Sequence, residues 1–378
     1  MGRLGIRVAT RAAAGALALA LTACAGLGRV APESPRPLTG IDAQRLSEAP
    51  APRPPEEILE VTDDMRQFVA RNVSRHVDVE RRIKQLTSAV LHPGTLGIAY
   101  HDRMTRTASE TFETANGNCL SLSMLFVALA REAGIEARFY EVNMVPEWTL
   151  AGDVVFATRH VNVGGRITAG TTYVMDFSPY VARREVGRHR LTDEEAIAQY
   201  YNNIGANYLA EGSIVAAYRH FVAGIEMAPR ISFLWSNLSV VYSRNGQSDA
   251  AEWALRRAVA IDGRNTSAMA NLARVLRERG ETEEAEALAA RIAGAQRDNP
   301  YYQFALGERH LAESEFRDAL RRLERAISLE PGEPLFYRKA AMAATALNDT
   351  ALAADYDGRA EKLDAEAQRR GRNAFRRR

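Results

Sequence analysis

The sequence predicts an α+β domain followed by an all-α superhelix of repeated helical pairs. Two observations in this chain of 378 residues lead to that fold class. A period of 34 residues runs from residue 198 to about residue 367, and upstream of it a long apolar helix is followed by segments that alternate as strands. The net charge is only +2, so the composition does not favour a partner bound by charge alone. The sequence contains no nucleic-acid-binding motif, and we expect no nucleic-acid partner.

The first 23 residues have the organisation of a secretory signal peptide. Arginines precede an apolar run, AAAGALALALTA, that is too short to span a bilayer. The run ends in LTAC, which resembles the bacterial lipobox. That resemblance implies lipidation of Cys24, and Ala25 implies an outer-membrane lipoprotein that faces the periplasm and contacts the membrane through its N-terminal lipid. An ordinary signal peptide with a chance cysteine is the alternative.

Composition divides the remainder of the chain. Residues 24–56 are rich in proline and predict an extended, semi-rigid tether. Residues 57–195 hold the α+β domain, and residues 198–367 hold about five repeats. Residues 368–378 form a basic tail that ends in RGRNAFRRR. We expect this tail to be a solvated, frayed terminus, and the less favoured alternative is a segment that binds a polyanion.

The repeats are marked by small residues at fixed positions. Windows that begin at residues 198, 232, 266, 300 and 334 share alanine at the twentieth position: Ala217, Ala251, Ala285, Ala319 and Ala353. The fifteenth position always holds a residue that tolerates a helix–helix turn: Gly212, Gly246, Gly280, Ser314 and Asn348. This pattern resembles the tetratricopeptide repeat. The resemblance implies stacked helical pairs whose concave face binds a protein partner, and the alternative is an array that packs only against its own neighbouring domain.

Within residues 57–195 the pattern changes from helices to strands. PPEEILEVTDDMRQFVARNV and DVERRIKQLTSAVL have helical apolar spacing, and a buried helix is expected from Leu120 to Ala133, ended by Gly134. Three strands follow, in IEARFYEV, VVFATRHVNVGG and TTYVMDFSP, and the glycine-containing GGRITAG is expected to be the loop between the last two.

A lone thiol stands at the start of the buried helix. If Cys24 is acylated, Cys119 has no partner for a disulfide, so it is either an inert buried thiol or is kept for chemistry. His160 and Asp176 lie in the two later strands. If the loop between those strands folds symmetrically about Thr168, the two side chains lie opposite each other, about 4.5–5.5 Å apart at Cβ, which suits an aspartate that orients an imidazole.

The stretch GNCLSLSMLFVALAREAGIEARFYEV, with RHVNV and YVMDFSP, resembles the transglutaminase-like superfamily over roughly residues 110–180. This resemblance implies a papain-like fold in which Cys119 is the nucleophile, His160 the general base and then acid, and Asp176 the orienting residue. The backbone N–H of Cys119 is an expected oxyanion donor, because early helical N–H groups lack intrahelical partners. Asn118 and Trp148 are candidates for a second donor, although Asn118 could equally be a helix N-cap.

Together these features predict an envelope lipoprotein with a thiol acyl-transfer site for a peptide or protein substrate. Water as acceptor would make it a peptidase or amidase, and an amine would make it a transferase. The alternative is a catalytically idle transglutaminase-like scaffold that acts as a protein-interaction module. We expect neither a cofactor nor a metal, because the sequence has no phosphate-binding glycine loop and no paired zinc-ligand spacing.

Overall fold

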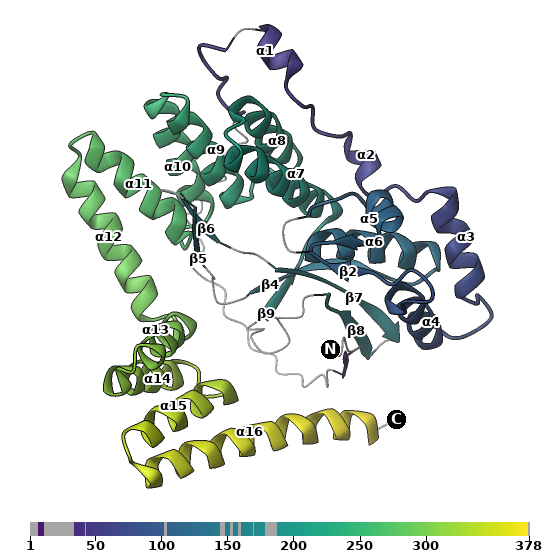
Figure 1. The fold of residues 1–378 in the computed structure, drawn as a ribbon, viewed down its shortest axis with the longest axis vertical. Helices are drawn as coiled ribbons and strands as arrows, with labels where there is room; N and C mark the ends of the chain where they lie inside the picture. Colours follow the sequence, from purple (N-terminus) through teal and green to yellow (C-terminus); the bar gives the residue numbers. More distant parts are fainter. Residues whose placement is uncertain are drawn as a thin grey trace, which may run out of the picture. The chain divides into compact units, whose positions relative to one another are not determined.

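The structure, a computed structural model, describes residues 7–10, 34–41, 43–101, 104–143, 148–151, 154–157, 160–168, 170–177 and 187–376 (Figure 1). The described residues form two compact units that meet in the sequence between Glu281 and Thr282. The N-terminal part of the first unit consists of β1 (Arg7–Thr10), α1 (Ala43–Glu48), α2 (Pro55–Ile58), α3 (Asp63–Asn72), α4 (Val79–Leu91), β2 (Ala99–Tyr100), α5 (Ala108–Thr114), β3 (Asn116–Gly117), α6 (Cys119–Glu132), β4 (Arg138–Asn143), β5 (Trp148–Ala151), β6 (Val154–Ala157), β7 (His160–Thr168), β8 (Thr171–Met175) and β9 (Gly187–Arg190). The predicted fold class, an α+β domain followed by an all-α repeat array, is confirmed.

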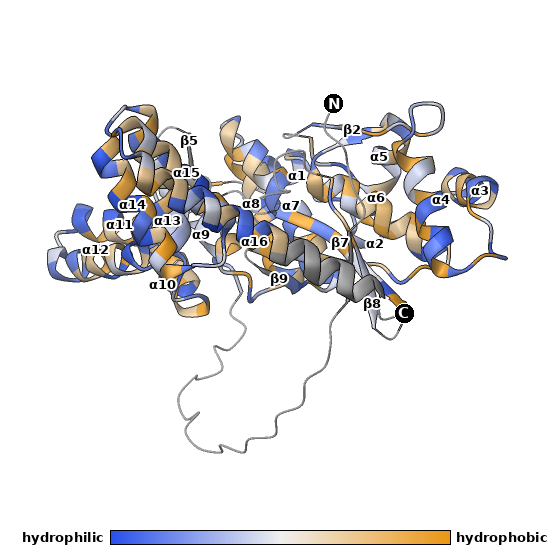
Figure 2. Cartoon of the chain, turned by 90° about the horizontal axis from the view of Figure 1, so that it is seen from below, coloured by the Kyte–Doolittle hydropathy of each residue, from blue (hydrophilic) through white to orange (hydrophobic). Residues whose placement is uncertain are grey.

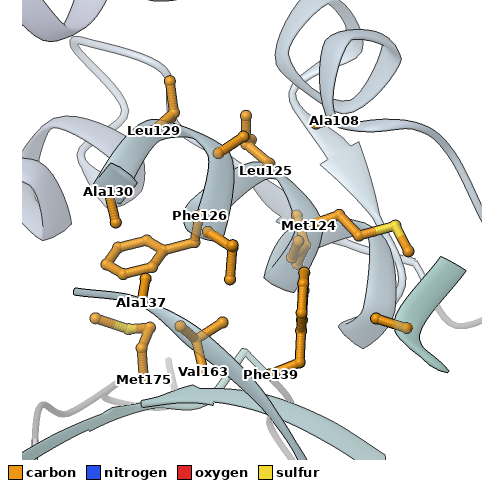
Figure 3. Packing of buried hydrophobic residues seen from close by; sticks show 14 of the residues in the cluster. Ala108, Met124, Leu125, Phe126, Leu129, Ala130, Ala137, Phe139, Val163 and Met175 are labelled. Atoms are coloured by element: carbon orange, nitrogen blue, oxygen red, sulfur yellow. The ribbon is translucent and has the colours of Figure 1, made fainter. Parts of the chain in front are cut away.

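The main sheet has five described strands in the order β1-β8-β7-β4-β9, and each neighbouring pair is antiparallel. The helix α6 packs on this sheet. In Figure 3, Phe126 of α6 lies over Val163 of β7 and Met175 of β8, and all three side chains are at most 1% exposed. Figure 2 shows α6 mostly orange along its length, as expected of a helix enclosed by protein. This packing fixes the start of α6 relative to the strand that carries His160.

The expected strand VVFATRHVNVGG ended at the two glycines, whereas the observed strand continues to Thr168, so the expected length of the loop GGRITAG was wrong. β7 continues through both glycines to Thr168 because another part of the chain crosses close to them. A Cβ on Gly165 would lie 1.8 Å from the backbone oxygen of Glu136, and a Cβ on Gly164 would lie 2.9 Å from the ring of Tyr140. The glycines therefore serve close approach in a strand and do not form a turn.

The longer strand also changes the register of the hairpin. Val163 pairs with Met175 and Gly164 with Val174, with an irregularity between Arg166 and Thr168. Continued by one residue, this register places Asp176 opposite position 162. His160 is therefore a diagonal neighbour of Asp176 on the same face, and the predicted register, symmetric about Thr168, was wrong by two residues.

The repeats begin within the first unit and continue into the second. Their helices are α7 (Asp193–Ala210), α8 (Ile214–Met227), α9 (Ser232–Arg244), α10 (Ser248–Ile261), α11 (Thr266–Glu278), α12 (Thr282–Arg297), α13 (Pro300–Ala312), α14 (Phe316–Leu329), α15 (Pro334–Ala346) and α16 (Thr350–Arg376). Four of the five predicted windows start where a helix starts, at residues 232, 266, 300 and 334. The predicted turn residues all adopt positive φ: Gly212, Gly246, Gly280, Ser314 and Asn348. Gly307 of α13 packs closely against α14, since a Cβ on Gly307 would lie 2.6 Å from Leu323.

The first repeat shares a core with the α+β domain. Ala196, Tyr200 and Tyr201 of α7 belong to the same buried apolar cluster as α6 and the sheet. The first compact unit extends to Glu281, within the repeats. The edge strand β9 was not predicted, because GRHR has no apolar alternation, and it forms by pairing with β4.

Both ends of the chain differ from the expectations in places. The residues from Ala12 to Cys24 lie outside the described residues, and β1 pairs with β8 within the segment expected to be a signal peptide. The tether contains the helix α1, although an extended chain was expected throughout. The tail is helical as far as Arg376, although a frayed terminus was expected. No helix in the described parts is long and apolar enough to cross a membrane.

Candidate active site

Cys119 is the first residue of α6, and its position follows from the sequence just before it. Asn118 has extended backbone angles. Its side-chain oxygen accepts two hydrogen bonds from Ser121, one from the backbone N–H and one from the side-chain hydroxyl, both at 3.0 Å. This N-cap starts the helix at the cysteine. Cys119 is a half-buried free thiol at the positive end of the helix dipole.

His160 and Asp176 are brought together at the end of the β7–β8 hairpin. The imidazole Nε2 of His160 lies 2.9 Å from Oδ1 and 2.8 Å from Oδ2 of Asp176. His160 is 4% exposed, and the carboxylate of Asp176 keeps partial access to solvent. A carboxylate accepts hydrogen bonds, so Nε2–H donates to Asp176 and Nδ1 is left for the sulfur of Cys119. The imidazole is thus oriented by a fixed partner.

The environment of His160 favours its charged form. Burial lowers the pKa of His160, but hydrogen bonds to Asp176 and to Cys119, together with the charges of both, raise the pKa to about 9. The folded-state pKa therefore lies above the ordinary value of about 6.5. The resulting stabilisation is fully present below about pH 6.5 and is lost as the pH rises through about 9. At neutral pH His160 is therefore an imidazolium.

The candidate oxyanion donors differ in whether they already make hydrogen bonds. The backbone N–H groups of Cys119 and Leu120 make no hydrogen bond within the described residues, as is usual for the first residues of a helix. The amide of Asn118 is engaged on both sides, since its Nδ2 donates to Thr105 at 2.7 Å while its oxygen caps the helix. The N-cap alternative for Asn118 is therefore the one that the structure bears out. The backbone of Trp148 begins β5, and its side chain lies outside what the structure describes.

Asn162 is a residue near the site that the sequence reasoning missed. It follows His160 by two positions on β7, so the two side chains share one face of the strand. Asn162 is fully buried, and neither its Oδ1 nor its Nδ2 has a hydrogen-bond partner among the described residues. An unpaired buried amide costs about 1–3 kcal/mol. The signal available in the sequence was a polar residue amid the apolar residues of RHVNV.

Two other features of the described residues resemble ligand sites. A hollow of about 420 Å³ adjoins Gly134, at the opposite end of the 14-residue α6 from Cys119, so it is separate from the thiol. In the second unit, His310, Glu313 and Glu315 are close enough together to share an ion. His310 Nδ1 already lies 2.5 Å from Glu315, and both carboxylates are exposed, so a surface ion pair accounts for this cluster.

Comparison with protein families agrees with this architecture. A model of the transglutaminase-like superfamily matches residues 67–175, which include Cys119 and His160 and end one residue before Asp176. A tetratricopeptide-repeat model matches residues 242–307. The chain therefore contains a transglutaminase-like domain and tetratricopeptide repeats. No curated protein sequence matches the chain.

Several solved structures resemble part of the chain. The crystal structure of MamA is 19% identical, covering 44% of this chain and 97% of that chain, with a TM-score of 0.26. MamA from Desulfovibrio magneticus RS-1 is 15% identical, covering 45% of this chain and 96% of that chain, with a TM-score of 0.25. Pseudomonas aeruginosa pilF is 20% identical, covering 46% of this chain and 78% of that chain, with a TM-score of 0.27. These similarities are too low to carry an argument about function.

Proposed function

We propose that the transglutaminase-like domain is a thiol acyltransferase that acts on amide bonds of a peptide or protein. The observation that carries the proposal is the hydrogen bond between His160 and Asp176, combined with the coupling of the same imidazole to Cys119. A nucleophile, a base and an orienting carboxylate are the three parts that this chemistry requires. A helix N-terminus with two free N–H groups at the cysteine supplies a place for the oxyanion.

The reaction follows from the charge state of the pair. The thiolate of Cys119 attacks the carbonyl carbon, and the oxyanion forms beside the first N–H groups of α6. His160 then donates its Nδ1 proton to the leaving nitrogen as the C–N bond breaks, and a thioester remains on Cys119. Neutral His160 next removes a proton from water or from an amine. That acceptor attacks the thioester, and the thiolate–imidazolium pair is restored.

A test of this proposal uses a protein substrate and both kinds of acceptor. The purified chain is incubated with casein and a fluorescent primary amine, and labelled casein and acid-soluble fragments are measured. We expect one of the two products, and we expect Cys119→Ser to lower its rate at least about a thousandfold. Product formed equally by the Cys119→Ser variant would contradict the proposal.

The repeats support a second part of the proposal. Tetratricopeptide arrays bury their apolar faces between neighbouring helical pairs and leave extended surfaces for protein partners. We propose that these repeats bind a protein partner or present a protein substrate. If the thiol proves unreactive while a partner is bound, the scaffold alternative gains support.

The location is proposed from the N-terminal sequence alone. The arginines, the short apolar run and LTAC support lipidation of Cys24 and attachment to the periplasmic face of the outer membrane. Mass spectrometry of the mature N-terminal peptide, with a Cys24→Ser variant as control, tests this part separately from the enzymatic part.

A further inference from the structure

The proline-rich tether is bound to the repeats along part of its length. Residues 34–41 contain no helix or strand, and the stretch that leads into α1 runs beside α8 (Figure 1). The hydrogen bonds of this segment go to α8, to the end of α9 and to the start of α10, about 180 to 210 residues further along the chain. All of these residues belong to the first unit. The contacts are therefore a defined interaction within one compact body.

Arg36 makes the densest set of contacts. Its carbonyl oxygen accepts hydrogen bonds from the hydroxyl of Tyr218, at 3.0 Å, and from the hydroxyl of Tyr242. Its guanidinium carbon lies 4.7 Å from the centre of the Trp253 ring, within the range of a cation–π interaction. One residue is thus recognised through both its backbone and its side chain.

The residues after Arg36 are bound through hydrogen bonds to their backbone. Gln247 accepts from the N–H of Thr39 at 3.1 Å and donates to the carbonyl of Pro37 at 3.2 Å. Asn245 donates to the carbonyl of Thr39 at 2.9 Å. These side chains stand at the turn between α9 and α10, and a further bond of 2.7 Å between the two amides orients them for an extended chain.

The aromatic part of this surface is held in place by its own neighbours. The ring of Trp253 meets the fully buried Trp235 edge to face, with centroids 5.3 Å apart. Tyr242 is buried, and its ring lies 6.3 Å from that of Tyr218. Aromatic side chains held by packing lose little conformational entropy on binding. Ring contacts within the repeats therefore help to hold Tyr218, Tyr242 and Trp253 in place.

We propose that Tyr218, Tyr242, Asn245, Gln247 and Trp253 form a binding site for an extended peptide with an arginine between two prolines, and that the tether occupies this site in cis. Prolines on both sides of the arginine favour the extended backbone that the site contacts. Arg36 itself is exposed above the tryptophan, so the bound segment can be replaced by a competing peptide. A partner of this site would carry a proline-flanked arginine in a segment without regular structure.

Binding of the tether also shortens the reach of the chain. From Cys24 to Arg36 an extended chain spans at most about 40 Å, whereas a free tether from Cys24 to residue 57 could span at most about 115 Å. With the lipid of the proposed anchor on Cys24, the docked tether holds the repeats close to the membrane. Release by a competing peptide would let the enzyme reach further. This consequence rests on the proposed location, but the binding site does not.

A labelled peptide with the sequence of residues 34–41 tests the site by fluorescence anisotropy. It is titrated into three full-length proteins: the wild type, a variant with residues 34–39 replaced by a Gly-Ser sequence of equal length, and that variant with Trp253→Ala added. The tether in cis acts at an effective concentration of about 1 mM. We therefore expect the Gly-Ser variant to bind the peptide at least about tenfold more tightly than the wild type does.

Two controls make the outcome decisive. Adding Trp253→Ala to the Gly-Ser variant should weaken peptide binding at least about tenfold. A peptide with glutamate in place of arginine should bind the Gly-Ser variant as weakly as the original peptide binds the Trp253→Ala protein. Equal affinity of the wild type and the Gly-Ser variant would overturn the proposal. So would binding that is unchanged by Trp253→Ala. These results do not depend on the thiol, so they leave the enzymatic proposal untouched.

Discussion

Replacing His160 with alanine is expected to slow the alkylation of Cys119 by iodoacetamide at pH 7 by about tenfold or more. Alkylation requires the thiolate, and a free cysteine is only a few per cent ionised at this pH. The imidazolium of His160, held by Asp176, is the full positive charge next to this sulfur, and the helix N-terminus adds only about half a charge. Removing the imidazolium therefore removes the larger stabiliser of the thiolate.

The measurement uses a Cys24→Ser background, in which Cys119 is the remaining thiol of the chain. The matched control is His189→Ala, because His189 is an exposed histidine of the same sheet. Its replacement should leave the alkylation rate unchanged. A rate in His160→Ala equal to that of the parent would mean that the thiol is not activated. The idle-scaffold alternative would then be favoured.

Replacing Gly165 with alanine is expected to destabilise the first unit by about 3 kcal/mol or more. The added Cβ would lie 1.8 Å from the backbone oxygen of Glu136 and 2.7 Å from the ring of Tyr173. Neither neighbour can yield easily, because one is backbone and the other is fully buried and donates a 2.8 Å hydrogen bond to that same oxygen. Relief requires that β7 move, and β7 carries His160.

Urea unfolding measures this effect, with Gly170→Ala as the matched control. Gly170 lies in the same hairpin, and a Cβ there would meet nothing within 4 Å. We expect the control to change the free energy of unfolding by less than about 1 kcal/mol. Similar stabilities of the two variants would show that the close approach at Gly165 does not exist in solution.

The repeats could be predicted closely because the same local requirement recurs five times. Each turn needs a residue that accepts positive φ, and the sequence supplies Gly, Ser or Asn at that spacing. The start of α6 was equally readable, because Asn118 caps the helix at the cysteine and Gly134 adopts positive φ just past its end. Local signals of this kind depend on few other parts of the chain.

The features that were missed depend on distant contacts. The glycines of β7 resemble a loop unless the crossing of Glu136 is known, and that error also displaced the predicted register. The proline-rich sequence of the tether predicts an unbound, extended segment. Its binding to the repeats depends on tyrosines, amides and a tryptophan far away in the sequence. Asp176 still reaches His160, because diagonal neighbours on one face lie within reach of long side chains.

The most direct test of the proposed site is the titration of His160 itself, followed by the NMR resonance of its imidazole Cε1–H. Loss of the resonance in His160→Ala assigns it. We expect a midpoint near pH 9 in the wild type and a lower midpoint in Asp176→Asn, because the carboxylate that stabilises the charged ring is removed. A wild-type midpoint near the ordinary value of about 6.5, unchanged by Asp176→Asn, would contradict a coupled Cys119–His160–Asp176 site.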